Sequence, residues 1–153
     1  ENAPALTSFS KMSYFISGYP SWTSRAKTAI SILHLVRMME TMEHPLHLCD
    51  IKSPHFGVMP NNEIKFIDAD TVFADETLSH DLGAPNCSDH ADCAFFDCDG
   101  WCQKSTGRCI PLRTNNNLQM VCAKIFKASF LSTYGGLLSS PPSAVAEELT
   151  NLL

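Results

Sequence analysis

The stretch that decides the fold is Leu48-Cys49-Asp50-Ile51-Lys52-Ser53-Pro54-His55, followed after two short apolar runs by Ile67-Asp68-Ala69-Asp70. The apolar runs are Phe-Gly-Val-Met at 56–59 and Ile-Lys-Phe-Ile at 64–67, and Pro-Asn-Asn-Glu separates them. Two short apolar runs around such a turn-forming sequence predict a β-hairpin. Asp50 and Asp68 are 18 positions apart (68 − 50), which is the separation that a tight hairpin between two loops requires.

A helix is predicted before this stretch, over residues 21–42. Apolar side chains recur there at intervals of three and four residues, as on one face of a helix. Ser21 or Thr23 is suited to cap its first turn, and Pro45 ends it. Because further apolar residues widen that face, we expect a buried central helix. The expected face is Trp22, Ala26, Ala29, Ile30, Leu33, Val36 and Arg37, widened by Ile32, Leu35, Met38 and Met39.

The remaining segments show weaker patterns. Residues 1–20 are predicted to be a loop with a short helical piece around Leu6–Phe15. Residues 71–86 have weak periodicity and are predicted to form a long loop. The C-terminal part, residues 115–153, is predicted to hold two helices, Leu118–Ser132 and Ser143–Leu153, the second capped by Ser143.

Composition limits the class of protein. The 153 residues are 44% hydrophobic and 18% charged, which is enough apolar material for one domain with a core. The net charge of −5 and the lack of a Lys/Arg cluster disfavour a nucleic-acid partner. The sequence contains no run of 18 apolar residues, so no membrane span is predicted within it. The chain begins at Glu1 without a secretory signal, so we expect a mature product or a fragment, with any signal or membrane anchor outside it.

Seven cysteines are present, and five of them fall within 87–109. The intervening gaps there are five, four, three and six residues, and none of them makes a C-x-x-C pair of the kind that holds structural zinc. We therefore expect disulfides and an oxidising compartment. Asn86 begins an Asn-Cys-Ser sequon and is a candidate glycosylation site. Cys49 is the candidate for the odd thiol, although a bridge to Cys122 or to a part of the protein outside the chain stays open. The cysteines expected in disulfides are Cys87, Cys93, Cys98, Cys102, Cys109 and Cys122.

The Cys-rich segment also carries aromatic residues but too few aliphatic ones for a core of its own. Phe95, Phe96 and Trp101 are therefore expected to pack onto the helical body.

The order of these features resembles the catalytic core of a protein-kinase C-lobe, which reads H-R-D-x-K-x-x-N, then a hairpin, then D-F-G. The resemblance puts Asp50 in the place of the catalytic Asp, Lys52 in that of its Lys, and Asp68 in that of the metal-binding Asp. Phosphoryl transfer needs a carboxylate at the accepting hydroxyl, a cation near the moving phosphoryl group and a carboxylate holding the metal. These three residues have the chemistry for those roles.

More specifically, residues 48–73 together with 87–109 resemble the divergent secretory-pathway protein kinases, the FAM69 group, and the likeness covers about 22–153. It implies a protein-kinase-like C-lobe, mainly α, with a small catalytic β-hairpin and a disulfide-rich insertion at 87–109. The implied cofactors are ATP and Mg²⁺ or Mn²⁺, bound together with an N-lobe outside this chain. The implied location is the endoplasmic reticulum or Golgi lumen, or outside the cell, with a protein substrate or binding partner there.

The chain departs from the kinase pattern at several positions. His55 stands where the pattern has the metal-binding Asn, and imidazole is a poor ligand for Mg²⁺. His55 is thus either a cofactor-binding residue or a hydrogen-bonded loop histidine. Leu48 and Cys49 replace the His-Arg pair. Asp70 replaces the Gly of D-F-G; on an extended segment it would point to the same side as Asp68, as a second metal ligand or as a solvated carboxylate.

Three functions remain open at this point. The first is ATP-dependent phosphoryl transfer to a lumenal or extracellular protein. The second is a pseudokinase that acts as a binding or regulatory module, which His55 and the altered D-F-G favour. The third is a cysteine-rich secreted ligand that binds no nucleotide. The sequence has no Gly-rich phosphate loop and no V-A-I-K-like strand, so it holds half of a kinase active site.

Overall fold

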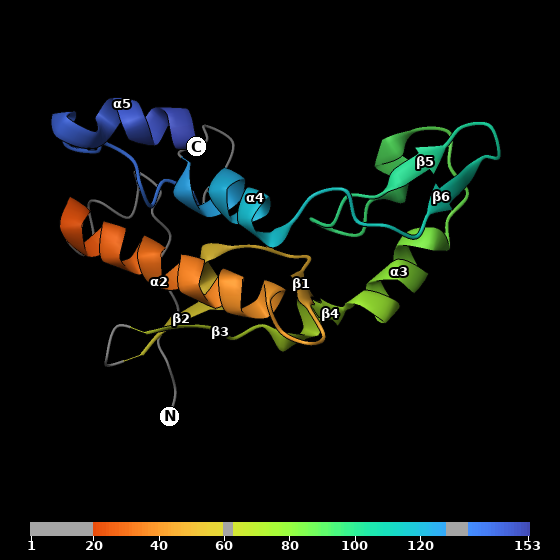
Figure 1. Ribbon diagram of the computed structural model, residues 1–153, viewed down its shortest axis with the longest axis horizontal. Coiled ribbons are helices and arrows are strands. Elements are labelled where there is room, and N and C mark those ends of the chain that lie inside the picture. Colours follow the sequence, from red (N-terminus) through yellow and green to blue (C-terminus); the bar gives the residue numbers. More distant parts are fainter. Residues whose placement is uncertain (1–19, 60–62, 128–134) are drawn as a thin grey trace. The chain divides into compact units, whose positions relative to one another are not determined.

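The computed structural model describes residues 20–59, 63–127 and 135–153 (Figure 1). The helical piece expected around Leu6–Phe15 lies outside these residues. These residues form helices and three two-stranded antiparallel sheets. The chain divides into two compact units, which we describe separately. The first comprises Glu1–Leu35, Ile51–Asp68 and Val121–Leu153, and the second comprises Val36–Asp50 and Ala69–Met120.

Helix α2 spans Trp22–Glu40 and confirms the predicted helix. The backbone N–H of Ser24 donates to the hydroxyl of Ser21 at 3.2 Å, so Ser21 caps the first turn. The expectation that most of this helix is buried is wrong, because Ile30 and Met38 are more than half exposed. The spacing of apolar residues in the sequence could not show which of several overlapping apolar stripes on this helix is buried. The stripe that is buried consists of Arg25, Ala29, Ile32, Val36 and Met39.

The predicted hairpin is confirmed. Strands β2 (Phe56–Val58) and β3 (Ile64–Phe66) are antiparallel, with Phe56 opposite Phe66. The backbone N–H of Ile64 donates to the hydroxyl of Ser31 on α2 at 3.1 Å, which holds the hairpin against this helix. Phe56 and Ile64 are buried.

The C-terminal part of the chain differs from the two helices predicted there. Helix α4 is short, Asn117–Val121, and continues as a π-helical turn, Cys122–Phe126; the rest of the helix expected to Ser132 lies largely outside the described residues. Helix α5 spans Ser143–Leu152. Its N-cap is Pro142, which corrects the prediction that Ser143 caps it.

In the second unit, strand β1 (Leu46–Leu48) pairs with β4 (Val72–Ala74). Helix α3 follows at Asp75–Gly83, so the long loop predicted over 71–86 is wrong. Asp75 and Glu76 lie in its first turn, where carboxylates favour the helix dipole. Leu78 and Leu82, four positions apart, are its buried residues. So few apolar residues give only a weak periodic signal.

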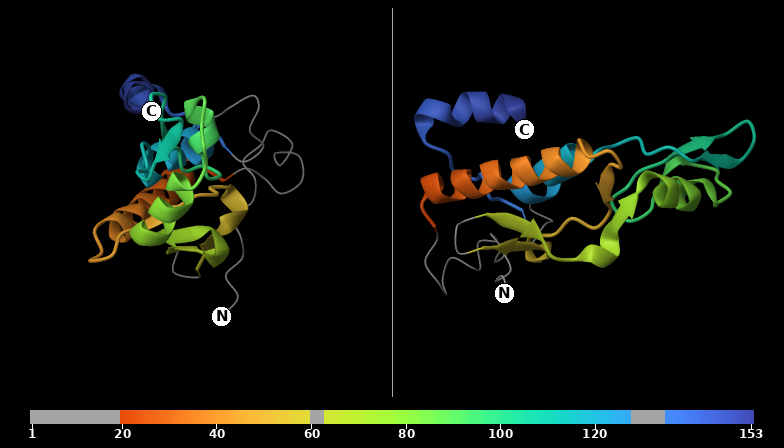
Figure 2. Two further views of the ribbon diagram at one scale, coloured as in Figure 1. Left: turned by 90° about the vertical axis from the view of Figure 1, so that its right-hand side faces the viewer. Right: turned by 60° about the horizontal axis from the view of Figure 1, so that its bottom comes forward.

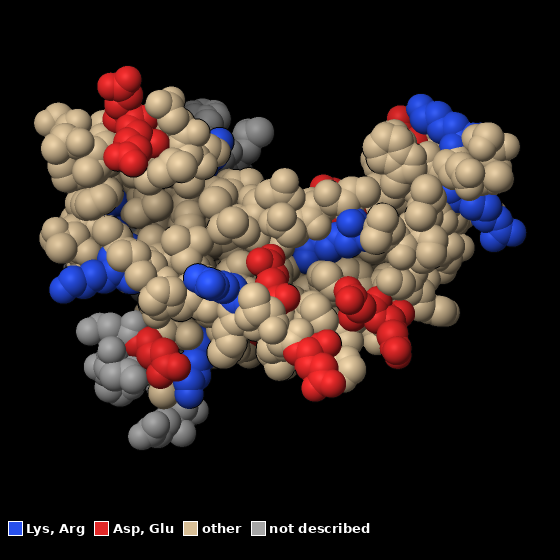
Figure 3. Space-filling model, viewed as in Figure 1, with Lys and Arg blue, Asp and Glu red and all other residues tan. Residues whose placement is uncertain are grey.

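The Cys-rich segment contains the hairpin of β5 (Trp101–Gln103) and β6 (Arg108–Ile110), whose turn includes Gly107 at φ 65°. Helix α3 lies against β6, and the views of Figure 2 agree on this neighbourhood. Lys and Arg atoms gather over the end of this hairpin in Figure 3, where Lys104 and Arg108 are exposed.

Three disulfides join Cys49 to Cys98, Cys87 to Cys102 and Cys93 to Cys109. The prediction of disulfides is therefore confirmed, but the choice of the odd cysteine is wrong. Cys122 carries the free thiol and Cys49 is bonded. Spacing along the chain does not fix disulfide pairing, because pairing requires Cα atoms within about 7 Å of each other.

The three aromatic residues of this segment behave differently. The rings of Phe95 and Phe73 are in contact, with centroids 5.1 Å apart. Phe96 and Trp101 are 67% and 50% exposed, so the prediction that they pack onto a helical body is wrong. Trp101 instead stacks on His90 of the same segment, at a centroid distance of 3.9 Å.

Among the described residues, no helix has the length and apolar character to cross a membrane.

Candidate functional site

The loop that carries the predicted site residues leads directly from β1 into the hairpin. Asp50 follows β1, and Lys52 is extended and half-buried. Pro54 helps to form a single 3₁₀ turn, Ser53–His55, because proline fixes the backbone angle needed at the start of a helix. The backbone N–H of Ile67 donates to the carbonyl of His55 at 2.8 Å, so the end of the loop is held against the segment that leads to Asp68.

His55 and Asp68 meet across the base of the hairpin. The Nδ1 atom of His55 lies 3.2 Å from a carboxylate oxygen of Asp68, and their side chains are 19% and 32% exposed. Within the first unit, His55 and Asp68 thus offer one imidazole nitrogen and one carboxylate oxygen as potential metal ligands. The structure therefore brings together the two residues that the sequence places at the Asn and the metal-binding Asp of the kinase pattern, and Asp50 precedes His55 in the same loop.

These two donors, a carboxylate oxygen and an imidazole nitrogen, suit a divalent cation. Carboxylates suit Mg²⁺ and Mn²⁺, whereas imidazole suits the transition metals better than Mg²⁺. The residues present thus fit the metal that the kinase resemblance implies, with Mn²⁺ fitting better than Mg²⁺. The hydroxyl of Ser53, between Lys52 and His55, is buried without a hydrogen-bond partner among the described residues.

Asp70 does not have the predicted arrangement. It lies in a 3₁₀ helix, Ala69–Thr71, and is exposed, so the segment after Asp68 is not extended. A helical turn does not place residues two apart on the same side.

Cys87, Cys93 and Cys102 have sulfur atoms within 4.8 Å of one another. Each of them is bonded in a disulfide, so none is the thiolate that a zinc site needs. Asn86 is exposed beside this cluster, as a glycosylation acceptor must be, and its modification stays a prediction.

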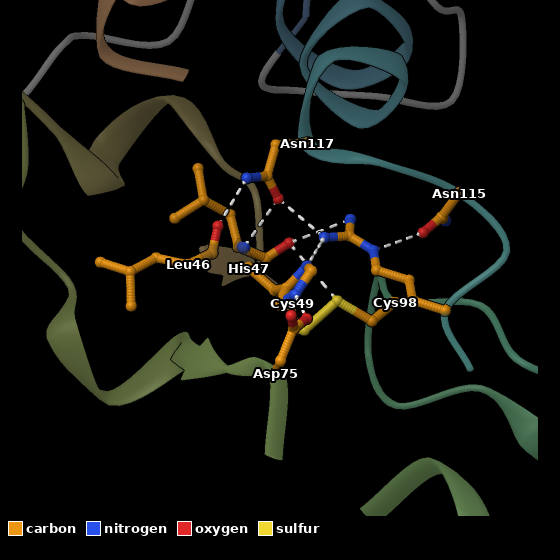
Figure 4. A network of polar contacts seen from close by, with 9 residues as sticks. Leu46, His47, Cys49, Asp75, Cys98, Asn115 and Asn117 are labelled. Carbon is orange, nitrogen blue, oxygen red and sulfur yellow. Dashed lines mark hydrogen bonds and ion pairs between the residues drawn. A yellow bond between two sulfur atoms is a disulfide. The ribbon is translucent and has the colours of Figure 1, made fainter. Parts of the chain in front are cut away.

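A second polar network lies on β1, just before Asp50 (Figure 4). Asn117 is 1% exposed; its Oδ1 accepts from the Leu48 N–H at 2.9 Å, and its Nδ2 donates to the Leu46 carbonyl at 2.8 Å. Arg113 donates through Nη1 to Asn117 Oδ1 at 2.7 Å and through Nε to Asn115 Oδ1 at 2.7 Å. Sequence reasoning missed this network, for which the run Asn115-Asn116-Asn117 is the only trace.

Arg113 also contacts a neighbouring histidine, His47. Its Nη1 lies 3.2 Å from Nδ1 of His47, and a guanidinium only donates hydrogen bonds. In this arrangement Nδ1 of His47 accepts from Arg113, and Nε2 donates to Asp75. Burial lowers the pKa of Arg113 to about 10, partly offset by the charges of Glu40 and two aspartates. A cavity of about 300 Å³ opens beside Arg113, His47 and Asp75.

The loop with two aspartates, the hairpin between them and the disulfide-bonded segment together define a protein-kinase-like domain. The chain belongs to the family described as the protein-kinase domain of FAM69, whose model matches residues 5–153.

Two relatives have the same name. Over 136 residues, the chain is 26% identical to divergent protein kinase domain 2A of Mus musculus and to that of Homo sapiens. The matches cover 83% of this chain and 32% of each relative, so the chain spans about a third of the length of these relatives. No solved structure matches the chain.

Proposed function

We propose that this chain is the C-lobe portion of a divergent protein kinase that transfers a phosphoryl group from ATP to a protein of the secretory pathway. The observation that carries the proposal is the contact of His55 with Asp68 at the base of the hairpin, with 3.2 Å between Nδ1 and a carboxylate oxygen. A Gly-rich loop and a strand lysine are absent from the sequence. The proposal therefore includes an N-lobe supplied by another part of the same protein.

Each residue of the loop has a distinct task in this proposal. Asp50 orients the accepting hydroxyl and takes its proton, and Lys52 supplies positive charge near the moving phosphoryl group. Asp68 and His55 hold the cation, which supplies charge neutralisation at the phosphates when it is bound. The hairpin holds Asp68 against His55, and positioning of this kind supplies much of the catalysis in phosphoryl transfer.

The disulfides support the cellular location. The chain has three disulfides, and such bonds persist in oxidising compartments and are rare in the cytosol. The exposed sequon at Asn86 suits the same compartment. A mass measurement of the protein from a secretory host tests this: we expect a glycan on Asn86, and an unmodified Asn86 would remove this support.

The proposal is tested by thermal denaturation of the full-length protein with ATP and Mn²⁺. A ligand at 100 times its dissociation constant stabilises the folded state by about 2.7 kcal/mol, so a clear rise in Tm is expected. Asp68→Asn should remove the rise, and Asp70→Asn, an exposed carboxylate of the neighbouring turn, is the matched control that should keep it. A wild-type protein with no shift in either Mg²⁺ or Mn²⁺ would contradict nucleotide binding.

The contact between His55 and Asp68 favours a second candidate, a pseudokinase that serves as a binding module. An imidazole that occupies the principal metal carboxylate competes with the cation for that oxygen. Turnover separates the two candidates. A pseudokinase keeps any nucleotide-dependent rise in Tm but transfers no phosphoryl group, and its properties do not change with Asp50→Asn.

A further inference from the structure

Strand β1 has two edges, and among the described residues one of them pairs with a strand, β4. Its other edge is covered by the amide of Asn117, which binds the Leu48 N–H and the Leu46 carbonyl. These two groups project to the same side because they are two residues apart on a strand. Asn117 thus takes the place of a neighbouring strand along β1, and it is almost completely buried.

Arg113 fixes the orientation of this amide. Its Nη1 donates to Asn117 Oδ1, so the oxygen must face Arg113 and the Leu48 N–H while the nitrogen faces Leu46. Asn115 accepts from Nε of Arg113 and donates to the Asp97 carbonyl at 2.9 Å. The guanidinium is therefore held from both sides, and among the described residues no carboxylate forms an ion pair with it.

Cys49, the residue that follows β1, is bound by the Cys-rich segment. The Cys49 carbonyl accepts from the Asp97 N–H at 2.7 Å, and Cys49 is bonded to Cys98. The backbone at positions 46, 48 and 49 is therefore fixed by Asn117, Arg113 and the segment around Asp97. Asp50 follows directly, so its backbone has little freedom to move.

We infer that Arg113 is a positioning residue for Asp50, acting through Asn117 and the backbone of β1. The inference rests on the proposed function for its catalytic consequence. The kinase pattern has an Arg directly before the catalytic Asp, but this position is Cys49 and is used by a disulfide. A guanidinium reaches the loop from residue 113 instead, with Nη2 3.5 Å from the Leu48 carbonyl.

We call the contacts of Arg113 and Asn117 with β1 the β1 clamp. Amide hydrogen exchange of the full-length protein tests this clamp and does not require a measurement of enzymatic activity. Arg113→Lys keeps the charge but loses the planar fork. We expect the Leu48 amide to exchange about tenfold faster, as the loss of a net hydrogen-bond contribution of about 1.4 kcal/mol implies. The Cys102 and Cys109 amides, in the β5–β6 hairpin of the same unit, should be unchanged. Equal acceleration at all three amides would show general destabilisation and overturn the inference.

Arg108→Lys is the matched control, because Arg108 is exposed and has no side-chain hydrogen bond or ion pair among the described residues. Arg108→Lys should leave the exchange rate of the Leu48 amide within about twofold of the wild-type rate. If Arg113→Lys does not fold, Asn115→Ala removes the Nε partner, together with the hydrogen bonds of Asn115 to Asp97 and Asp99, and leaves the bond from Arg113 to Asn117 in place. It should accelerate exchange of the Leu48 amide by a smaller factor. An unchanged Leu48 amide in the folded variants would overturn the clamp.

Turnover tests the catalytic consequence. With ATP and Mn²⁺, Arg113→Lys should lower kcat about 10- to 100-fold, the scale of a small misplacement, and leave the nucleotide KM within about twofold. A changed KM with an unchanged kcat would overturn the positioning role. A wild-type protein without turnover would refute the proposed function and the catalytic role, while the exchange data would still decide whether the clamp exists.

Discussion

Cys49 and Cys98 are 49 positions apart in the sequence and are joined by a disulfide with Cα atoms 5.0 Å apart. Both are completely buried, and Leu78 and Leu82 of α3 pack with them. Because Cys49 precedes Asp50, this bond ties the candidate catalytic loop covalently to the Cys-rich segment. The segment thus supports the loop rather than standing apart from it.

Removal of this disulfide should destabilise the protein strongly. The double variant Cys49→Ala, Cys98→Ala should lower the free energy of unfolding by about 4 kcal/mol, because the bond closes a long loop in the unfolded chain. Cys122→Ser, at the free thiol, should cost less than about 1 kcal/mol. Urea denaturation without reductant measures both. Similar losses in the two variants would contradict the structural importance of the bond.

The native protein should contain one titratable thiol, and it should react slowly. Burial raises the pKa of the Cys122 thiol, so less thiolate is present at neutral pH than for an exposed cysteine. Ellman's reagent should modify one thiol per chain, faster in urea than in buffer. Three thiols in the native protein would refute the pairing, and equal rates in urea and buffer would refute the burial of Cys122.

Replacing His55 by Asn should change the metal preference. Wild-type protein should bind Mn²⁺ with ATP more tightly than Mg²⁺ with ATP, because imidazole is a better ligand for Mn²⁺. His55→Asn should reduce the preference by at least about tenfold, the scale on which changes at a metal site alter affinity. Calorimetric titration with each metal gives the ratio, with Asp70→Asn as control. An unchanged ratio in His55→Asn would show that His55 is not a ligand.

Acid should weaken the turn that begins the Cys-rich segment. The Asp92 carboxylate accepts from the Ser88 N–H at 2.8 Å and from the Asp89 N–H at 3.0 Å, which lowers the pKa of Asp92 below 3.8. A carboxyl whose pKa is lowered by folding stabilises the folded state above its unfolded pKa. The contribution is lost as the pH falls below 3.8 through the lowered value. Asp92→Asn should therefore flatten the decrease in unfolding free energy between pH 5 and about pH 3; an identical decrease would contradict this role.

The parts of the site that could be predicted are those that are local in sequence. Two apolar runs and a turn give the hairpin, and the hairpin alone brings Asp68 back to the loop of His55. The contact at 3.2 Å follows from this short connection. Asp70 was misplaced because a 3₁₀ turn follows Asp68, and D-x-D carries no signal that separates such a turn from an extended segment.

The parts that could not be predicted depend on long-range contacts. Helix α3 has two buried leucines in nine residues, and these pack on a disulfide whose partners are distant in sequence. Arg113 and Asn117 act on β1 from more than 60 positions away. Polar residues in an apparent loop give no periodic pattern, so only the folded chain shows what they bind.

The central claim, that Asp50 and Asp68 serve phosphoryl transfer, is tested most directly by transfer of labelled γ-phosphate from ATP with Mn²⁺, catalysed by the full-length protein and by its Asp50→Asn variant. Asp50 contributes in the transition state, so the variant should bind nucleotide within about twofold of the wild type and lose about 10²- to 10⁴-fold in turnover. Equal transfer by the two proteins, or no transfer by a wild-type protein that binds ATP and Mn²⁺, would contradict the account.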